Sequence, residues 1–155
     1  MNDSLPPVVP YIGRFAPSPT GPLHFGSLVA ALASFLDAKA NQGRWLVRIE
    51  DIDPPRIQPG ATKEILQALE NHGLHWNDEV LYQSDRVSLY KEILTELIQN
   101  KQAYYCDCSR QSLKDHPKYP GFCSQNITKS DNSAIRVRTG DEPVTFEDGV
   151  QGHQK

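Results

Sequence analysis

Apolar and polar positions in the first half of the chain alternate between the periods of strands and of helices. A short apolar run at residues 8–12 predicts a strand, and the alanine-rich segment 28–40 predicts a helix that ends near Gly43. A second apolar run at residues 45–49 predicts another strand. A strand, a helix and a strand in this order predict a parallel βαβ unit, with a right-handed crossover as the default.

Two further segments carry apolar residues at helical spacing. Residues 61–72 end at Gly73, and residues 85–100 begin at a cap formed by Ser84 or Asp85. We expect the apolar stripes of both helices to face a core, and such stripes carry no information about function.

The pattern changes after the short strand predicted at residues 103–106. The periodicity fades there, and further strands are expected only at residues 134–138 and 144–146. The fold class is therefore α/β. We expect residues 1–105 to form the main domain and residues 106–155 to form a smaller insertion and the start of a connecting subdomain.

Composition limits the classes of protein that fit. The chain has 155 residues, enough for one compact domain or slightly more, and its net charge of −3 gives no basic field over the whole chain. Its three clustered cysteines are too few for a secreted disulfide framework. Without a long apolar run or a signal-like start, we expect a cytoplasmic protein with no membrane segment, and residues 1–7 as a loose lead-in.

The loop from Arg14 to Ser27 lies where the first strand leads into the first helix. Three prolines stiffen it, and a helix N-terminus offers unpaired N–H groups to an anion. His24 adds a donor, and Gly26 lacks a Cβ, so a flat ring has room against the backbone. These features predict a nucleotide or phosphate site. The alternative is a proline-rich connector with a stray histidine.

This loop resembles the signature loop of class I aminoacyl-tRNA synthetases. The opening Arg-Phe-Ala-Pro-Ser-Pro at residues 14–19 is similar to the glutamyl branch, and His24-Phe25-Gly26-Ser27 stands in the signature position. Phe25 and Ser27 resemble the glutamyl-queuosine tRNA(Asp) synthetases, short relatives that lack an anticodon-binding domain. The resemblance implies an incomplete Rossmann-like class I catalytic domain with a small zinc-bearing insertion. Residues 1–105 are then the first half of the nucleotide-binding domain, and residues 106–155 hold the zinc.

An acidic cluster follows the second strand, at the edge of the sheet where ligands of α/β proteins bind. Glu50, Asp51 and Asp53 are close enough to repel one another unless cations or a polar ligand offset their charges. The cluster is either a polar pocket or a solvated acidic turn held by Arg48 and Arg56. The resemblance implies the pocket, with Glu50 binding the amino group of the substrate.

Arg14 stands at the end of the first strand, where its planar guanidinium suits a carboxylate. The resemblance implies that it reads the side-chain carboxylate of a glutamate substrate, with Ser18 and the backbone of Ala16 completing the pocket. The alternative is a surface arginine paired with Glu50 or Asp51.

Three thiols near one turn, Cys106, Cys108 and Cys123, indicate a metal more than a disulfide in a reducing compartment. Zinc takes four ligands, so one more is needed. Chemistry alone nominates His116, the nearest imidazole, whereas the resemblance nominates Tyr119 and a structural zinc. The alternative is a set of free structural cysteines. The resemblance also places this insertion near the tRNA.

The resemblance implies a ligase that uses ATP and Mg²⁺. His24 and Ser27 would be catalytic and, with Gly26, would bind ATP, while L-glutamate would form an adenylate before its transfer to the queuosine base of tRNA(Asp). Two other readings remain: a fragment of an ordinary glutamyl-tRNA synthetase that charges tRNA(Glu), and a non-catalytic, zinc-bearing nucleotide-binding module.

Class I synthetases complete their ATP site with a second, lysine-bearing loop of the Lys-Met-Ser-Lys-Ser type. Residues 107–155 contain no match, because Thr128-Lys129-Ser130 is too short. The resemblance covers almost all of this chain but only about the first half of a family member. We expect a fragment, an interrupted gene or a missing half supplied by another molecule, and we expect the 155-residue chain alone not to catalyse glutamate-dependent pyrophosphate exchange.

Overall fold

The computed structural model describes residues 10–116, 118–126, 128–140 and 142–155. The chain divides into two compact units, unit 1 up to Ser88 and unit 2 from Leu89 to Lys155. The domain boundary predicted after residue 105 stays a prediction. No helix among the described residues has the length and apolar character needed to cross a bilayer.

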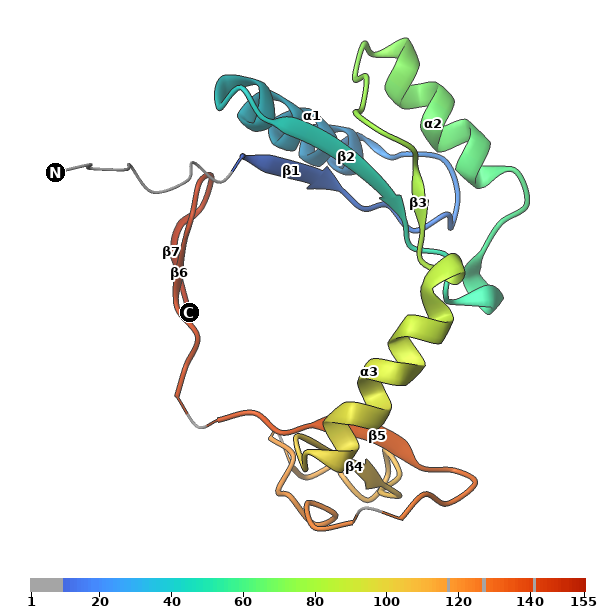
Figure 1. Ribbon diagram of the computed structural model, residues 1–155, viewed down its shortest axis with the longest axis vertical. Helices are drawn as coiled ribbons and strands as arrows, with labels where there is room; N and C mark the ends of the chain where they lie inside the picture. The colour runs from blue at the N-terminus through green and yellow to red at the C-terminus, as the bar shows by residue number, and fades with distance from the viewer. Residues whose placement is uncertain (1–9, 117, 127, 141) are drawn as a thin grey trace, which may run out of the picture. The chain divides into compact units, whose positions relative to one another are not determined.

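Unit 1 is built on a three-stranded parallel sheet with the strand order β1-β2-β3 (Figure 1). The strands are β1 (Ile12–Phe15), β2 (Arg44–Ile49) and β3 (Leu81–Tyr82), and α1 (Phe25–Ala40) connects the first two. The predicted parallel βαβ unit is therefore confirmed. The two-residue β3 was not predicted, because two residues are too few to show a period.

The first strand lies later in the chain than its apolar run predicted. Residues 8 and 9 of the expected strand, like the lead-in at residues 1–7, lie outside the described residues, and β1 begins at Ile12. Gly13, which directly follows the apolar run, lies inside β1. A glycine fits there because α1 packs against it. A Cβ built at Gly13 would meet the Ala38 side chain and the Ser34 carbonyl oxygen at 3.0 Å.

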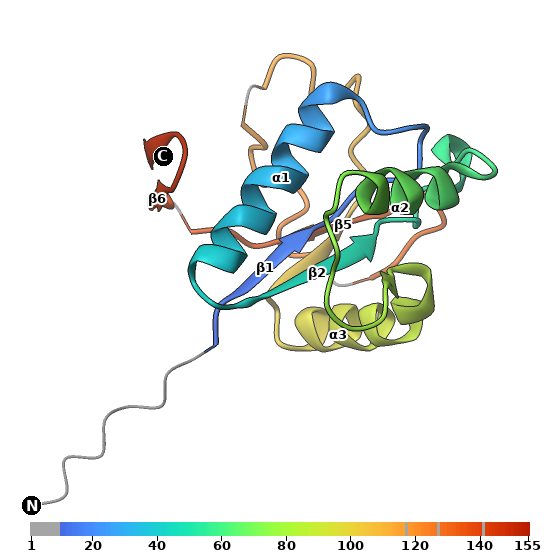
Figure 2. The same cartoon turned by 90° about the horizontal axis from the view of Figure 1, so that it is seen from above.

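The core of unit 1 centres on β2, whose Trp45, Val47 and Ile49 are buried. Figure 2 shows α1 lying along β1 and β2, where its Phe35 ring meets the Trp45 ring edge-on with centroids 5.3 Å apart. The Trp45 indole N–H donates to Ser34 Oγ at 2.9 Å, which satisfies a buried donor. The second helix of the unit is α2 (Ala61–Asn71), and its Leu69 joins this core, as the apolar stripe predicted.

Asn77 occupies the edge of β2 ahead of β3. Its side-chain oxygen accepts from the Trp45 backbone N–H at 2.8 Å, and its own N–H donates to the Trp45 carbonyl at 2.7 Å. An asparagine thus pairs with β2 as a strand residue would. Two short 3-10 turns follow the second and third strands: η1 (Pro54–Arg56) comes after β2, and η2 (Ser84–Arg86) comes after β3.

The helix α3 (Val87–Gln99) follows η2 and lies mostly in unit 2. Its predicted bounds are nearly right, since η2 occupies the first two expected residues. The expectation that its stripe faces a core is wrong for this structure. No residue of α3 is buried, and Leu89 and Ile93 are 39% and 47% exposed.

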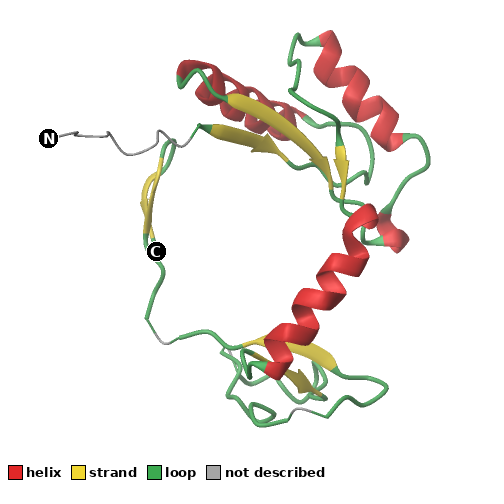
Figure 3. Cartoon of the chain, in the orientation of Figure 1, coloured by secondary structure: helices red, strands yellow, loops and turns green. Residues whose placement is uncertain are grey.

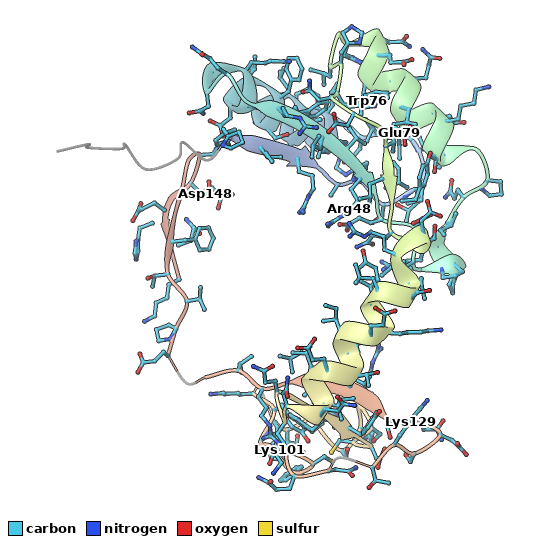
Figure 4. The ribbon with its side chains drawn as sticks, in the orientation of Figure 1. Arg48, Trp76, Glu79, Lys101, Lys129 and Asp148 are labelled. Carbon is cyan, nitrogen blue, oxygen red and sulfur yellow. The ribbon has the colours of Figure 1, made fainter. Side chains whose placement is uncertain are left out.

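Apart from most of α3, unit 2 consists of loops and two small antiparallel pairs (Figure 3). The predicted strands at 103–106 and 134–138 are confirmed as β4 (Ala103–Cys106) and β5 (Ala134–Val137), which pair with each other. The strand expected at 144–146 is misplaced, because β6 (Phe146–Asp148) pairs with β7 (Gly152–Gln154) across a turn. Asp148, labelled in Figure 4, fixes this turn by accepting from the N–H groups of Val150 and Gln151 at 2.8 Å.

Candidate functional site

The loop between β1 and α1 is held in place by backbone hydrogen bonds to its neighbours. Pro17 accepts from the Glu50 N–H at 2.9 Å, and Pro19 accepts from the Gln58 N–H at the same distance. Prolines restrict the remaining dihedral freedom of the loop. These bonds fix the loop against the carboxyl end of β2 and against the residues that follow η1.

His24 and Ser27 lie in contact at the start of α1. His24 is the N-cap, so the helix begins at Phe25 rather than at the predicted residue 28. Its Nδ1 accepts from the Ser27 N–H at 3.2 Å, and its Nε2 lies 3.0 Å from Ser27 Oγ. The pairing sets the imidazole across the first turn, beside the helix N–H groups that favour anions.

Gly26 faces the imidazole of this pair. A Cβ at Gly26 would lie 3.2 Å from His24 Cε1 and 3.3 Å from Nδ1, tighter than ordinary van der Waals contact. The flat ring that needs the missing Cβ in this structure is thus the His24 side chain. Glycine at this position lets the capping geometry form.

A cavity of about 320 Å³ opens beside the His24–Ser27 pair. Its lining includes four of the predicted site residues, namely Ala16, Ser18, His24 and Ser27. Arg14, Gly26 and Glu50 are not part of that lining. The structure therefore gathers the loop residues around one space but does not place the whole predicted set there.

The acidic turn after β2 is internally paired. Glu50 Oε1 lies 2.5 Å from Nη2 of Arg48, and Asp53 Oδ2 lies 2.5 Å from Arg56. These are the partners that the solvated-turn alternative named. Arg14 is exposed and has no ion pair among the described residues, so it does not pair with Glu50 or Asp51.

Asp51 joins two loops of unit 1. Its carboxylate accepts from Ser84 Oγ at 2.6 Å and from the Ser84 N–H at 2.9 Å. Burial raises the pKa of Asp51, but these hydrogen bonds outweigh it and hold the pKa below its ordinary value. Sequence reasoning missed Ser84 in this role, because the link spans 33 residues.

The three cysteines of unit 2 converge on one point. Their sulfur atoms lie within 4.8 Å of one another, and all three thiols are free. The Tyr119 hydroxyl lies 3.3 Å from Cys106 Sγ and 3.9 Å from Cys108 Sγ. The His116 ring instead packs edge-on against Phe122, and this histidine is not part of the metal-ligating group found among the described residues.

The thiols of this cluster differ in acidity. Burial alone would raise the pKa of Cys106, but hydrogen bonds from Tyr119 and Arg136 lower it to about 6. The hydrogen bond with Cys123, together with burial, raises the pKa of Cys108. Burial and the hydrogen bond with Cys106 raise the pKa of Tyr119. Three sulfurs and one phenol oxygen this close form a donor set that suits a tetrahedral zinc ion.

Arg136 stands beside this cluster and was not predicted as a site residue. It lies on β5, and its guanidinium carbon is 4.2 Å from the centroid of the Tyr119 ring. The available signal was the alternation of residues 134–138, which places Arg136 and Arg138 on one face of a strand. The local pattern does not indicate that β5 pairs with β4, the strand that ends at Cys106.

The chain is similar to curated proteins over most of its length. It is 53% identical over 146 residues to the glutamyl-Q tRNA(Asp) synthetase of Pseudomonas fluorescens Pf-5, an alignment that covers 94% of this chain and 49% of the relative. It is 52% identical over 143 residues to the glutamyl-Q tRNA(Asp) synthetase of Escherichia coli K12, covering 92% of this chain and 46% of the relative. The chain thus spans about half the length of the curated relatives it matches.

The fold is also similar to that of a solved structure. A glutamate tRNA ligase from Elizabethkingia meningosepticum, crystallised in complex with its amino acid, superposes with a TM-score of 0.73 and 26% identity. The match covers 92% of this chain and 35% of that chain. The model of the family described as tRNA synthetases class I (E and Q), catalytic domain, matches residues 12–152. A strand, the loop in the signature position and a helix follow one another along the chain. The chain therefore belongs to the class I tRNA synthetases (E and Q) and forms part of their catalytic domain.

Proposed function

We propose that the protein containing this chain activates L-glutamate with ATP and transfers the glutamyl group to the queuosine base of tRNA(Asp). The observation that carries this proposal is the His24–Ser27 pair, which caps α1 beside a cavity. It occurs in a chain about half identical to proteins named glutamyl-Q tRNA(Asp) synthetase.

In this proposal ATP lies across the loop before α1. His24, Gly26 and Ser27 bind it, with the imidazole and the helix N–H groups facing the phosphates. The α-carboxylate of glutamate attacks the α-phosphorus, the bond to the bridging oxygen breaks, and pyrophosphate leaves. Mg²⁺ supplies positive charge to the phosphate oxygens. The protein contributes position and charge stabilisation, which suffices for phosphoryl chemistry of this kind.

Arg14, Ser18, the Ala16 backbone and Glu50 bind glutamate in this proposal. Arg14 is exposed and carries no carboxylate partner among the described residues, so its guanidinium is available for the substrate side chain. Glu50 is bound to Arg48, and the substrate ammonium joins or replaces that contact. The acceptor in the second step is a hydroxyl of the tRNA, so no side chain is assigned as its base.

We further propose that Cys106, Cys108, Cys123 and Tyr119 hold a structural zinc ion. The close approach of their four donor atoms supports this set, and the edge-on packing of His116 against Phe122 favours Tyr119 over the histidine. Bound zinc ties together a region with little apolar content of its own. Metal analysis of the purified chain tests it, and a chain without metal after expression in zinc-supplemented medium would contradict it.

Two other functions are distinguished by the same assay. The similarity to solved glutamate tRNA ligases is the observation that favours an ordinary glutamyl-tRNA synthetase. The cavity beside the capped start of α1 would also suit a non-catalytic nucleotide-binding module.

The test measures charging with labelled glutamate by the purified protein. The substrates are tRNA(Asp) with queuosine, tRNA(Asp) without it, and tRNA(Glu). Charging of the first alone supports the proposal, and charging of tRNA(Glu) would replace it with the second function. ATP binding without charging of any tRNA would favour the third.

Variants locate the site. His24→Ala removes the cap and the phosphate donor, and we expect it to lower the rate of adenylate formation on the order of 10²-fold. His75→Ala is the matched control, because His75 is an exposed histidine of unit 1 outside this site. Equal rates for the two variants would contradict the role of His24.

A further inference from the structure

Arg136 approaches the cysteine cluster from the strand that pairs with β4. In the register of β4 and β5, Arg136 lies opposite Tyr104 and Ala134 lies opposite Cys106. The Arg136 guanidinium lies over the Tyr119 ring, with 4.2 Å from its carbon to the ring centroid, and the Tyr119 hydroxyl lies 3.3 Å from Cys106 Sγ. One cation therefore contacts one of the four proposed zinc ligands directly, from the strand that pairs with the strand carrying another.

The net charge of the proposed zinc site explains what a cation there would do. Three thiolates and one phenolate carry two more negative charges than Zn²⁺ neutralises. A guanidinium keeps its charge at every relevant pH and, unlike lysine, stacks flat on an aromatic ring. A cation against the ring face lowers the free energy of the anionic ligand set.

The free hydrogen-bonding capacity of Arg136 points the same way. Its Nε–H is buried and has no hydrogen-bond partner among the described residues. A buried donor without an acceptor is costly, and an anionic ligand set beside the guanidinium would offset that cost.

Arg138 provides a contrast two residues further along. Its guanidinium lies over the Tyr104 ring at 5.1 Å, and its N–H groups donate to the backbone carbonyls of Lys101 and Ser124. It thus stacks on a tyrosine of β4 that is not one of the proposed zinc ligands. Arg138 therefore contacts only groups that hold the fold, whereas Arg136 contacts a proposed metal ligand.

We propose that Arg136 is a positioning residue of the metal centre, which orients Tyr119 by its ring face and places a fixed positive charge beside the ligand set. The inference rests on the proposed zinc site. It adds a residue outside the ligand set that tunes the affinity for the metal, as groups hydrogen-bonded to metal ligands do in other sites.

The test uses the 155-residue chain and the metals Zn²⁺ and Co²⁺ alone. Zinc affinity is measured by competition with a chromophoric chelator, and Co²⁺ reports ligand geometry through its visible absorption. We expect Arg136→Gln to weaken zinc binding about 10- to 100-fold and to shift the Co²⁺ bands. Arg136→Lys keeps the charge and should recover part of the affinity. Arg138→Gln, the matched control, should keep both the affinity and the spectrum.

The outcomes separate the two proposals. A wild-type chain that binds neither metal overturns the zinc site and this inference with it. A wild-type chain that binds zinc, with Arg136→Gln binding equally well, overturns only the role of Arg136. Equal losses in Arg136→Gln and Arg138→Gln also overturn it, because they indicate a general loss of the fold.

A second measurement covers the case in which Arg136→Gln does not fold. Tyr119→Phe removes the proposed ligand oxygen, and Arg136→Lys is then compared in the wild-type and Tyr119→Phe backgrounds. If Arg136 acts through Tyr119, the effect of the lysine substitution shrinks in the phenylalanine background. Identical effects in both backgrounds overturn the inference.

Discussion

The loop before α1 and the cysteine cluster after β4 are held in place by different forces. The loop lies against a core that includes the buried Trp45, Val47 and Ile49, and its backbone is hydrogen-bonded to Glu50 and Gln58. In unit 2 the buried apolar residues are few among those described, namely Ala103, Tyr104 and Cys106.

The difference teaches that packing and hydrogen bonds order one site, while the other has little packing of its own. A loop ordered in this way binds a ligand with little entropic cost for ordering it. A region with so little apolar burial does not by itself offset the conformational entropy of its loops, and the proposed zinc ion would supply the missing free energy.

Removal of zinc is expected to have the largest effect, and to act on unit 2 first. A strong chelator should abolish the protection of β4 and β5 amides against hydrogen exchange, since structural zinc contributes on the order of 10 kcal/mol to small domains. The amides of β1 and β2 serve as the internal control. Unchanged exchange in β4 and β5 after complete demetallation would contradict the contrast between the units.

Trp45→Ala is the corresponding change in unit 1. It removes the largest fully buried side chain and should lower the free energy of unfolding of unit 1 by about 4 kcal/mol. Trp45→Phe is the control, since it keeps an aromatic ring and loses the hydrogen bond to Ser34. Denaturant unfolding monitored at unit 1 measures both, and a loss under about 1 kcal/mol for the alanine variant would argue against packing as the source of order.

Gly26→Ala should impair catalysis with little loss of stability. The new methyl group would push the His24 ring by a few tenths of an ångström, because a Cβ there meets Cε1 at 3.2 Å. We expect adenylate formation by the complete protein to fall about 10-fold, or about 1.4 kcal/mol in the activation barrier. Gly60→Ala is unsuitable as a control because Gly60 has a φ of 85°, whereas Gly149→Ala meets no atom within 4 Å. A fully active Gly26→Ala enzyme would indicate that the position of the imidazole is not critical.

Asp51→Asn should have the smallest effect, and one that depends on pH. The pKa of Asp51 is lowered in the folded chain, so its contribution to stability is present above the unfolded pKa of about 3.9 and is lost as the pH falls through the lower, folded pKa. At pH 7 we expect the variant to be less stable by about 1 kcal/mol, allowing for solvent screening. Unfolding free energies of both chains between pH 3 and 7 check this, and a difference that does not change with pH would refute it.

The sequence predicted the parts of the molecule that depend on local pattern. The βαβ unit and α2 followed from apolar periodicity, and the cysteines converged as their spacing indicated. The start of β1 was wrong because Gly13 belongs to a strand for a tertiary reason, the approach of α1.

The contacts that could not be predicted from the sequence are those between residues far apart in the chain. No local signal joins Asp51 to Ser84, or Arg136 to Cys106, because each pair meets only after separate strands have paired. The ion pair between Glu50 and Arg48 is local, yet its role depends on whether a substrate ammonium displaces it.

Asn77 precedes the third strand of unit 1 and bonds both backbone groups of Trp45, one through its side chain and the other through its own N–H. Further along, β3 pairs with Arg48 and Ile49 of β2. Just past this pairing the Gln83 N–H donates to the Ile49 carbonyl at 3.0 Å, and Ser84 meets Asp51. The number of residues between positions 77 and 84 matches the distance between these two contacts. One inserted residue would move Ser84 out of register with the Asp51 carboxylate.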